Sequence, residues 1–130
     1  MSRILIAEDS VSIRLLLRRR LEMAEHEVIE ARDGVEALEI LEARQGNDGP
    51  DVVLLDATMP RMDGAAALRE IKGNAPDLPV LVVSAIYELD DSHGWGRADG
   101  HVTKPIDFDG LLARIDLLTG GRPRPGSPSP

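Results

Sequence analysis

The feature that most constrains this chain is a repeated alternation of short apolar runs with segments of helical periodicity. The runs Ile4–Ala7, Val52–Leu55 and Val80–Val83 are bounded by polar or turn residues. They predict strands that are buried on both faces. Two weaker segments, Glu27–Ala31 and His101–Thr103, predict strands at the edges of the same sheet.

Helical patterns lie between and after the runs. We expect helices over Ser10–Met23, from an Asp33 cap with Glu36 at the third helical position, over Gly64–Lys72, and from an Asp107 cap to Gly120. In the first helix the spacing places one set of side chains on the sheet (Ile13, Leu16, Leu17, Leu21) and leaves another for solvent (Arg14, Arg18, Arg19). A further helix between Ile86 and Asp99 should be short or frayed, because Gly94 and Gly96 disfavour it.

Alternating strands and helices favour right-handed crossovers and a parallel sheet. The fold class predicted is α/β, a flavodoxin-like doubly wound sheet of five parallel strands in the order 2-1-3-4-5, with helices on both faces. Residues 1–119 form the expected domain. Residues 120–130, which are rich in Pro, Gly and Ser, are expected to be a disordered tail.

Composition excludes several classes of function. The chain has no cysteine, so disulfides, thiolate metal sites and thiol nucleophiles are ruled out. The 15 Lys and Arg against 23 Asp and Glu give a net charge of −8, which argues against direct binding of nucleic acid. No apolar run is long enough for membrane insertion and the N-terminus does not resemble a secretory signal, so the expected location is cytoplasmic.

Polar side chains follow the predicted strands at the point where each one ends. Glu8 and Asp9 follow the first strand, Asp56 the third, Ser84 the fourth and Lys104 the fifth. The carboxyl ends of parallel strands share one edge of a sheet, so three carboxylates should crowd there. A hard divalent cation such as Mg²⁺ would offset their repulsion. With an ammonium and a hydroxyl nearby, the inventory suits phosphoryl transfer, with Asp56 able to attack phosphorus.

In order and spacing, these residues resemble the receiver domain of bacterial two-component response regulators, similar to the single-domain chemotaxis regulator. The resemblance covers roughly residues 2–119 and rests on five short motifs: Glu8-Asp9, Asp56, Met59-Pro60-Arg61-Met62-Asp63-Gly64, Ser84-Ala85 and Lys104-Pro105. It implies a phosphorelay protein that is not a turnover enzyme. It also implies partners of two kinds, namely a histidine kinase or phosphotransfer protein and a downstream protein target.

The resemblance also implies a role for each site residue. Asp56 would accept the phosphoryl group. Mg²⁺ would be bound by Asp9, Asp56 and the backbone carbonyl of Thr58, with Glu8 acting mostly through water. Lys104 would pair with the phosphoryl oxygens, Ser84 would move to hydrogen-bond them, and the Lys104–Pro105 bond would be cis.

The sequence departs from the family pattern in places. His101 stands where relatives carry the aromatic residue that moves with Ser84, so the switch would be either an ordinary steric one or sensitive to pH. Trp95, in the glycine-containing segment, would serve either as an anchor on the output surface or as a patch over the core. Ile86 cannot orient a water molecule, which predicts slow self-dephosphorylation.

Other classes of function remain alternatives. The chain could be a degenerate receiver that acts as a scaffold, or the receiver fragment of a larger regulator. A dehalogenase-type phosphotransferase would need a second Asp where Thr58 stands, and a flavin carrier would need a phosphate-binding loop after the first strand.

Overall fold

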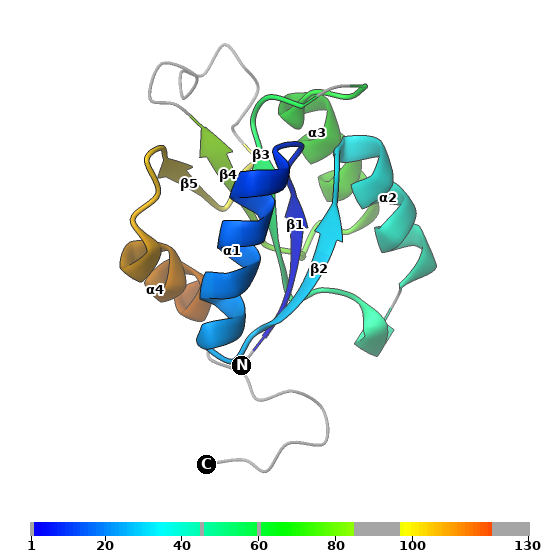
Figure 1. Ribbon diagram of the computed structural model, residues 1–130. Coiled ribbons are helices and arrows are strands. Elements are labelled where there is room, and N and C mark those ends of the chain that lie inside the picture. The colour runs from blue at the N-terminus through cyan, green and yellow to red at the C-terminus, as the bar shows by residue number, and fades with distance from the viewer. Residues whose placement is uncertain (1, 45, 60, 85–96, 121–130) are drawn as a thin grey trace.

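The computed structural model describes residues 2–44, 46–59, 61–84 and 97–120, which form a five-stranded parallel sheet flanked by helices (Figure 1). The elements in chain order are β1 (Arg3–Ala7), α1 (Val11–Met23), β2 (Glu27–Ala31), α2 (Gly34–Ala43), η1 (Gly46–Asp48), β3 (Val52–Asp56), α3 (Gly64–Asn74), β4 (Val80–Ser84), β5 (Gly100–Thr103) and α4 (Phe108–Thr119). The strand order is β2-β1-β3-β4-β5. The predicted fold class and strand order are therefore confirmed.

The helices form a layer on each face of the sheet (Figure 1). On one face, Leu17 and Leu21 of α1 and Ile115 of α4 pack against β1 and β3. On the other, Ala67 and Leu68 of α3 join α2 over the opposite side of the same strands. β3 and β4 are buried along their whole length, which explains why their sequences are continuous apolar runs rather than alternating ones.

Most helix ends are capped, as expected at Asp33 and Gly120. The side chains of Ser10, Asp33 and Asp63 accept hydrogen bonds from the first turns of α1, α2 and α3, and Gly120 ends α4 in the left-handed conformation. Asp107 occupies the N-cap of α4 but makes no capping hydrogen bond with its side chain. The prediction for this cap is therefore correct in position only.

Two expectations about the first helix are wrong. Leu16 is 50% exposed, because α1 turns Leu17 and Leu21 toward the sheet. The buried face of this helix is therefore narrower than its apolar spacing suggests. Arg14 is expected in solvent, but its side chain is only 13% exposed and bonds to Glu30 of β2. An acidic residue on the edge strand draws this arginine inward.

An ion pair between a buried lysine and a partly exposed aspartate fixes the start of β5 beside β4. Lys72 of α3 lies 2.6 Å from Asp99 (Nζ to Oδ2), and the same carboxylate accepts the backbone N–H of Val80. Asp99 in turn donates its backbone N–H to the Val80 carbonyl. The pairing that follows sets Ser84 opposite Thr103, which places Lys104 at the carboxyl edge of the sheet.

Some expectations fall outside the described residues. These are the short helix between Ile86 and Asp99, the roles of Trp95 and Ile86, and the tail beyond Gly120. Within the described ranges, no helix is both long and apolar enough to cross a lipid bilayer.

We expect Leu54→Ala in β3 to lower the free energy of unfolding by about 2 to 5 kcal/mol, because it leaves a cavity in a fully buried strand. Urea denaturation followed by circular dichroism measures the change. Leu117→Ala removes the same atoms from an 81% exposed position and should change stability by less than about 0.5 kcal/mol. Equal losses in the two variants would contradict the assignment of Leu54 to the core.

Candidate functional site

Three carboxylates meet at the carboxyl edge of the sheet. Glu8 and Asp9 leave β1, and Asp56 ends the neighbouring strand β3. One oxygen from each lies within 4.8 Å of the others. Glu8 and Asp56 are 2% and 4% exposed, whereas Asp9 is open to solvent. The sequence prediction that these three residues converge is thus confirmed.

Asp56 has two donors on the same carboxylate oxygen. The ammonium of Lys104 lies 3.3 Å from its Oδ1, and the backbone N–H of Thr58 lies 3.4 Å from it. The Lys104–Pro105 peptide is cis, as the resemblance implied. The backbone N–H of Lys104 also donates to the Ser84 carbonyl, so the ends of β4 and β5 are joined at the site.

The two buried acids share one environment and hold their protons unequally. Burial raises the pKa of Glu8 from its ordinary value of 4.5 to about 7, with the nearby charge of Asp56 adding to the effect and the Ser10 N–H opposing it. Burial also raises the pKa of Asp56, against the opposing influence of Glu8 and Lys104. Of these two acids, we assign the protonated form to Glu8, because Lys104 stabilises the charged form of Asp56.

Two buried polar atoms near this edge lack a hydrogen-bond partner among the described residues. They are the hydroxyl oxygen of Ser84, in a residue with no exposed surface, and Nε2 of His101 on the adjacent strand. A buried hydroxyl without a partner lowers the stability of the fold by about 1 to 3 kcal/mol, and a ligand that accepted a hydrogen bond from it would offset this cost. The expected roles of Ser84 and His101 in switching remain predictions.

The loop after Asp56 is held close to the strand by a glycine. A Cβ atom on Gly64 would lie 2.6 Å from the Asp56 carbonyl oxygen and 2.8 Å from the Cα of Ala57. Gly64 also donates its N–H to the Ala57 carbonyl. This contact gives a physical reason for the Asp63-Gly64 pair, whose Asp caps α3 while the Gly lets that helix begin against the site.

An ion pair ties the same loop to the start of α2. Arg61 makes two hydrogen bonds to Asp33, at 2.7 and 3.0 Å, and its own backbone is left-handed, with φ of 65°. The guanidinium holds the pKa of Asp33 below its ordinary value. Sequence reasoning identified Asp33 only as a cap, and no spacing rule would have paired it with Arg61.

The donor set fits a hard divalent cation. All of the side-chain donors are carboxylate oxygens, from one exposed and two buried residues, and Mg²⁺ prefers oxygen ligands. Burial, with a smaller contribution from the charge of Asp56, raises the pKa of Glu8, so the charged form of this carboxylate is disfavoured at the site. A cation bound there would favour the charged form.

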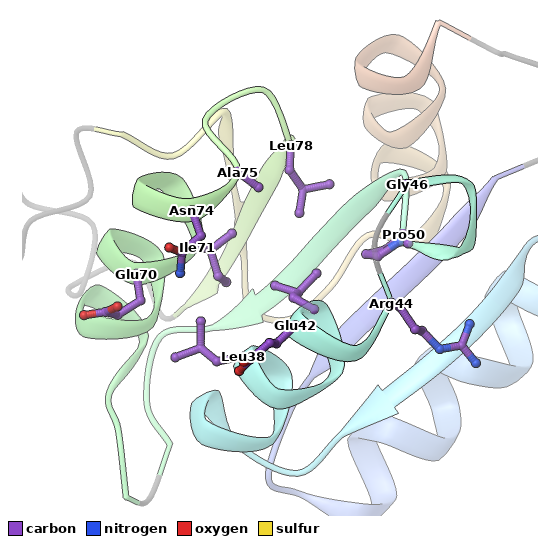
Figure 2. A pocket seen from close by; sticks show the side chains of 12 residues that line it. Leu38, Glu42, Arg44, Gly46, Pro50, Glu70, Ile71, Asn74, Ala75 and Leu78 are labelled. Carbon is purple, nitrogen blue, oxygen red and sulfur yellow. The ribbon is translucent and has the colours of Figure 1, made fainter.

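A separate groove lies near the amino ends of β3 and β4, away from the acidic residues. Figure 2 shows it between α2, α3 and the segments that precede β3 and β4. Its volume is about 830 Å³. Leu38, Ile71 and Leu78 line its apolar part, and Glu42 and Glu70 stand on the helices that flank it. It contains none of the predicted site residues.

Comparison with known proteins identifies the family of this chain. The family model for the response regulator receiver domain matches residues 4–116, so this chain belongs to the response regulator receiver family. It is 37% identical over 131 residues to response regulator MprA of Mycobacterium sp. strain KMS, covering 98% of this chain and 55% of that protein. For MprA of Mycobacterium tuberculosis strain H37Rv the figures are 37% over 118 residues, 89% and 50%. The chain thus spans about half the length of these relatives.

Solved structures agree with this assignment. A receiver domain protein from Clostridium thermocellum matches with a TM-score of 0.84 at 28% identity, covering 93% of this chain and 96% of that one. Response regulator TrrA of Thermotoga maritima, solved in complex with Mg²⁺ and BeF, matches with a TM-score of 0.81 at 30% identity, covering 91% and 99%.

We expect the raised pKa of Glu8 to make the stability of the fold depend on pH. Because its pKa is higher in the folded chain than in the unfolded one, folding takes up a proton between about pH 4.5 and 7, and the stability gained is full below pH 4.5 and lost as pH rises through 7. With divalent ions chelated, wild type should therefore lose stability relative to Glu8→Gln between pH 4.5 and 8. Urea midpoints measured across this range test it, and parallel curves for the two proteins would contradict it.

Proposed function

We propose that this chain is a phosphorelay receiver that accepts a phosphoryl group on Asp56 and changes its affinity for a protein partner. The observation that carries the proposal is the convergence of Glu8, Asp9 and Asp56 beside the ammonium of Lys104. The donors are a histidine kinase or a phosphotransfer protein, and the output is a downstream protein. The family assignment supports both partner classes.

The chemistry divides among residues already in place. A carboxylate oxygen of Asp56 attacks the phosphorus of a phosphohistidine, forming an O–P bond as the N–P bond breaks and the imidazole nitrogen leaves with the electron pair. Lys104, 3.3 Å from Asp56, neutralises charge on the phosphoryl oxygens. The hydroxyl of Ser84 donates to one of them and so gains the partner that it lacks among the described residues.

Asp9, Asp56 and the backbone carbonyl of Thr58 would hold Mg²⁺, and Glu8 would act mostly through water. When bound, the cation supplies positive charge that lets a phosphoryl dianion approach three carboxylates. The Mg²⁺ in the complex formed by TrrA of Thermotoga maritima supports this choice of metal.

Phosphorylation adds about −1.5 to −2 charges, which bias an existing conformational equilibrium. Signalling therefore proceeds through protein contacts, without direct binding of nucleic acid or insertion into a membrane, and we place the protein in the cytoplasm. It is not a turnover enzyme, although it takes part in its own phosphorylation. Residues 1–119 make up the domain, and the relatives' double length is compatible with a receiver from a larger regulator. The alternative is a degenerate receiver that serves as a scaffold.

Incubation with Mg²⁺ and acetyl phosphate should add the mass of one phosphoryl group to wild type and none to Asp56→Asn. Chelation of Mg²⁺ should abolish the gain. Intact-mass spectrometry measures both. Asp77→Asn is the matched control that should label like wild type, because Asp77 lies in an exposed turn before β4, at the amino end of the sheet. Labelling of Asp56→Asn to the wild-type extent would remove Asp56 from its role, whereas no labelling with any donor would favour the scaffold.

A chain ending at Gly120 should fold and label like the full chain. The left-handed cap on α4 is retained, and the residues removed lie beyond the expected domain. Thermal denaturation should show a Tm within about 2 °C of the full-length value, a small shift beside the 4–8 °C per kcal/mol typical of small domains. A larger loss would show that the tail belongs to the domain.

A further inference from the structure

We propose that Arg14 of α1 is a positioning residue for the metal-binding loop, and that Glu30 of the edge strand β2 holds Arg14 in place. The inference rests on the proposed function, since it concerns how the acidic loop is set to receive Mg²⁺. It goes beyond that function by assigning a role to two residues outside the acidic cluster.

The contacts of Arg14 reach the loop directly. Its Nη1 donates to the backbone carbonyl of Glu8 at 2.8 Å, and its Nε donates to Oε1 of Glu30 at 3.0 Å. The side chain is only 13% exposed. A guanidinium is planar and presents its donors in a fixed geometry. The bond from Nε to Glu30 of β2 therefore determines where Nη1 meets the carbonyl of Glu8.

The bond to the Glu8 carbonyl completes the fixing of this loop. The Glu8 N–H donates to Ala31 at 3.1 Å, and the Glu8 carboxylate accepts from the Ser10 N–H at 3.0 Å. The Glu8 carbonyl and the Asp9 N–H belong to one planar peptide unit. By holding that carbonyl, Arg14 orients the plane from which the exposed Asp9 side chain departs, which no other contact described for this peptide does.

Arg18 provides a natural comparison. It lies one turn further along α1 and also bonds to Glu30, and it makes a second bond to Glu22 at 3.2 Å. It has no contact with the loop among the described residues. Loss of either arginine changes the net charge equally and leaves Glu30 with one arginine partner, but only loss of Arg14 releases the Glu8 carbonyl.

Removal of a residue that orients metal ligands without touching the metal typically lowers metal affinity by about 10- to 100-fold. We therefore expect Arg14→Gln to weaken Mg²⁺ binding about 10-fold. Glu30→Gln should weaken it by only a few-fold, because the bond from Arg14 to Glu8 survives. The double variant should match Arg14→Gln alone, since Glu30 acts through Arg14.

The test is a titration of the full chain with MgCl₂, followed by the backbone amide signals of residues 8–10 and 56–58 in two-dimensional NMR, which also report whether each variant is folded. Arg18→Gln is the matched control and should stay within two-fold of wild type. Arg14→Lys keeps the charge but not the planar guanidinium and should still bind at least about 3-fold more weakly, which provides a second variant if Arg14→Gln does not fold. The labelling of Asp56 by acetyl phosphate should recover in the Arg14 variants at saturating Mg²⁺, which a general loss of structure would not allow.

The outcomes separate the two proposals. A wild type that gives no response to Mg²⁺ overturns the metal site itself, and with it this inference. A wild type that binds Mg²⁺ while Arg14→Gln binds within two-fold of it overturns the inference alone. Equal weakening by Arg14→Gln and Arg18→Gln also overturns it, because the effect would then not depend on the bond from Arg14 to the Glu8 carbonyl.

Discussion

The burial of two neighbouring carboxylates, Glu8 and Asp56, at one sheet edge is the constraint on which the rest of this structure depends. Parallel strands bring Glu8 and Asp56 side by side where they leave the core, and burial makes the charge on each one costly. The surrounding residues moderate that cost without removing it. Lys104 and the Thr58 N–H stabilise Asp56, and the Ser10 N–H stabilises Glu8.

The two helical layers hold this edge from different sides. On the α1 side, the guanidinium of Arg14 reaches the loop after β1. On the α3 side, Gly64 lets the helix begin against the end of β3, and the pair between Arg61 and Asp33 ties the intervening loop to α2. The ion pair between Lys72 and Asp99 holds the start of β5 beside β4, and the register of these strands places Lys104 at the same edge. Function at the edge therefore depends on contacts from most of the fold.

The alternation of strands and helices predicted a doubly wound parallel sheet, and placing the two weak strands at its edges predicted the strand order. The convergence of Glu8, Asp9, Asp56 and Lys104 followed, because the carboxyl ends of parallel strands share one edge. The sequence was not sufficient for the supporting contacts. Arg14 looks like a solvent-facing residue on a helical wheel, and only the three-dimensional position of Glu30 draws it inward. Leu16 has the spacing of a core residue, yet its exposure depends on how α1 is rotated over the sheet. Such contacts join residues whose separation along the chain follows no periodic rule.

The contact between Gly64 and the end of β3 limits how this chain can diverge. A methyl group is the smallest carbon substituent that a mutation could add there, yet its closest neighbours would be backbone atoms of Asp56 and Ala57 rather than yielding side chains. Relief would require the backbone at the start of α3 or at the end of β3 to shift. Local backbone geometry alone therefore restricts position 64 to glycine.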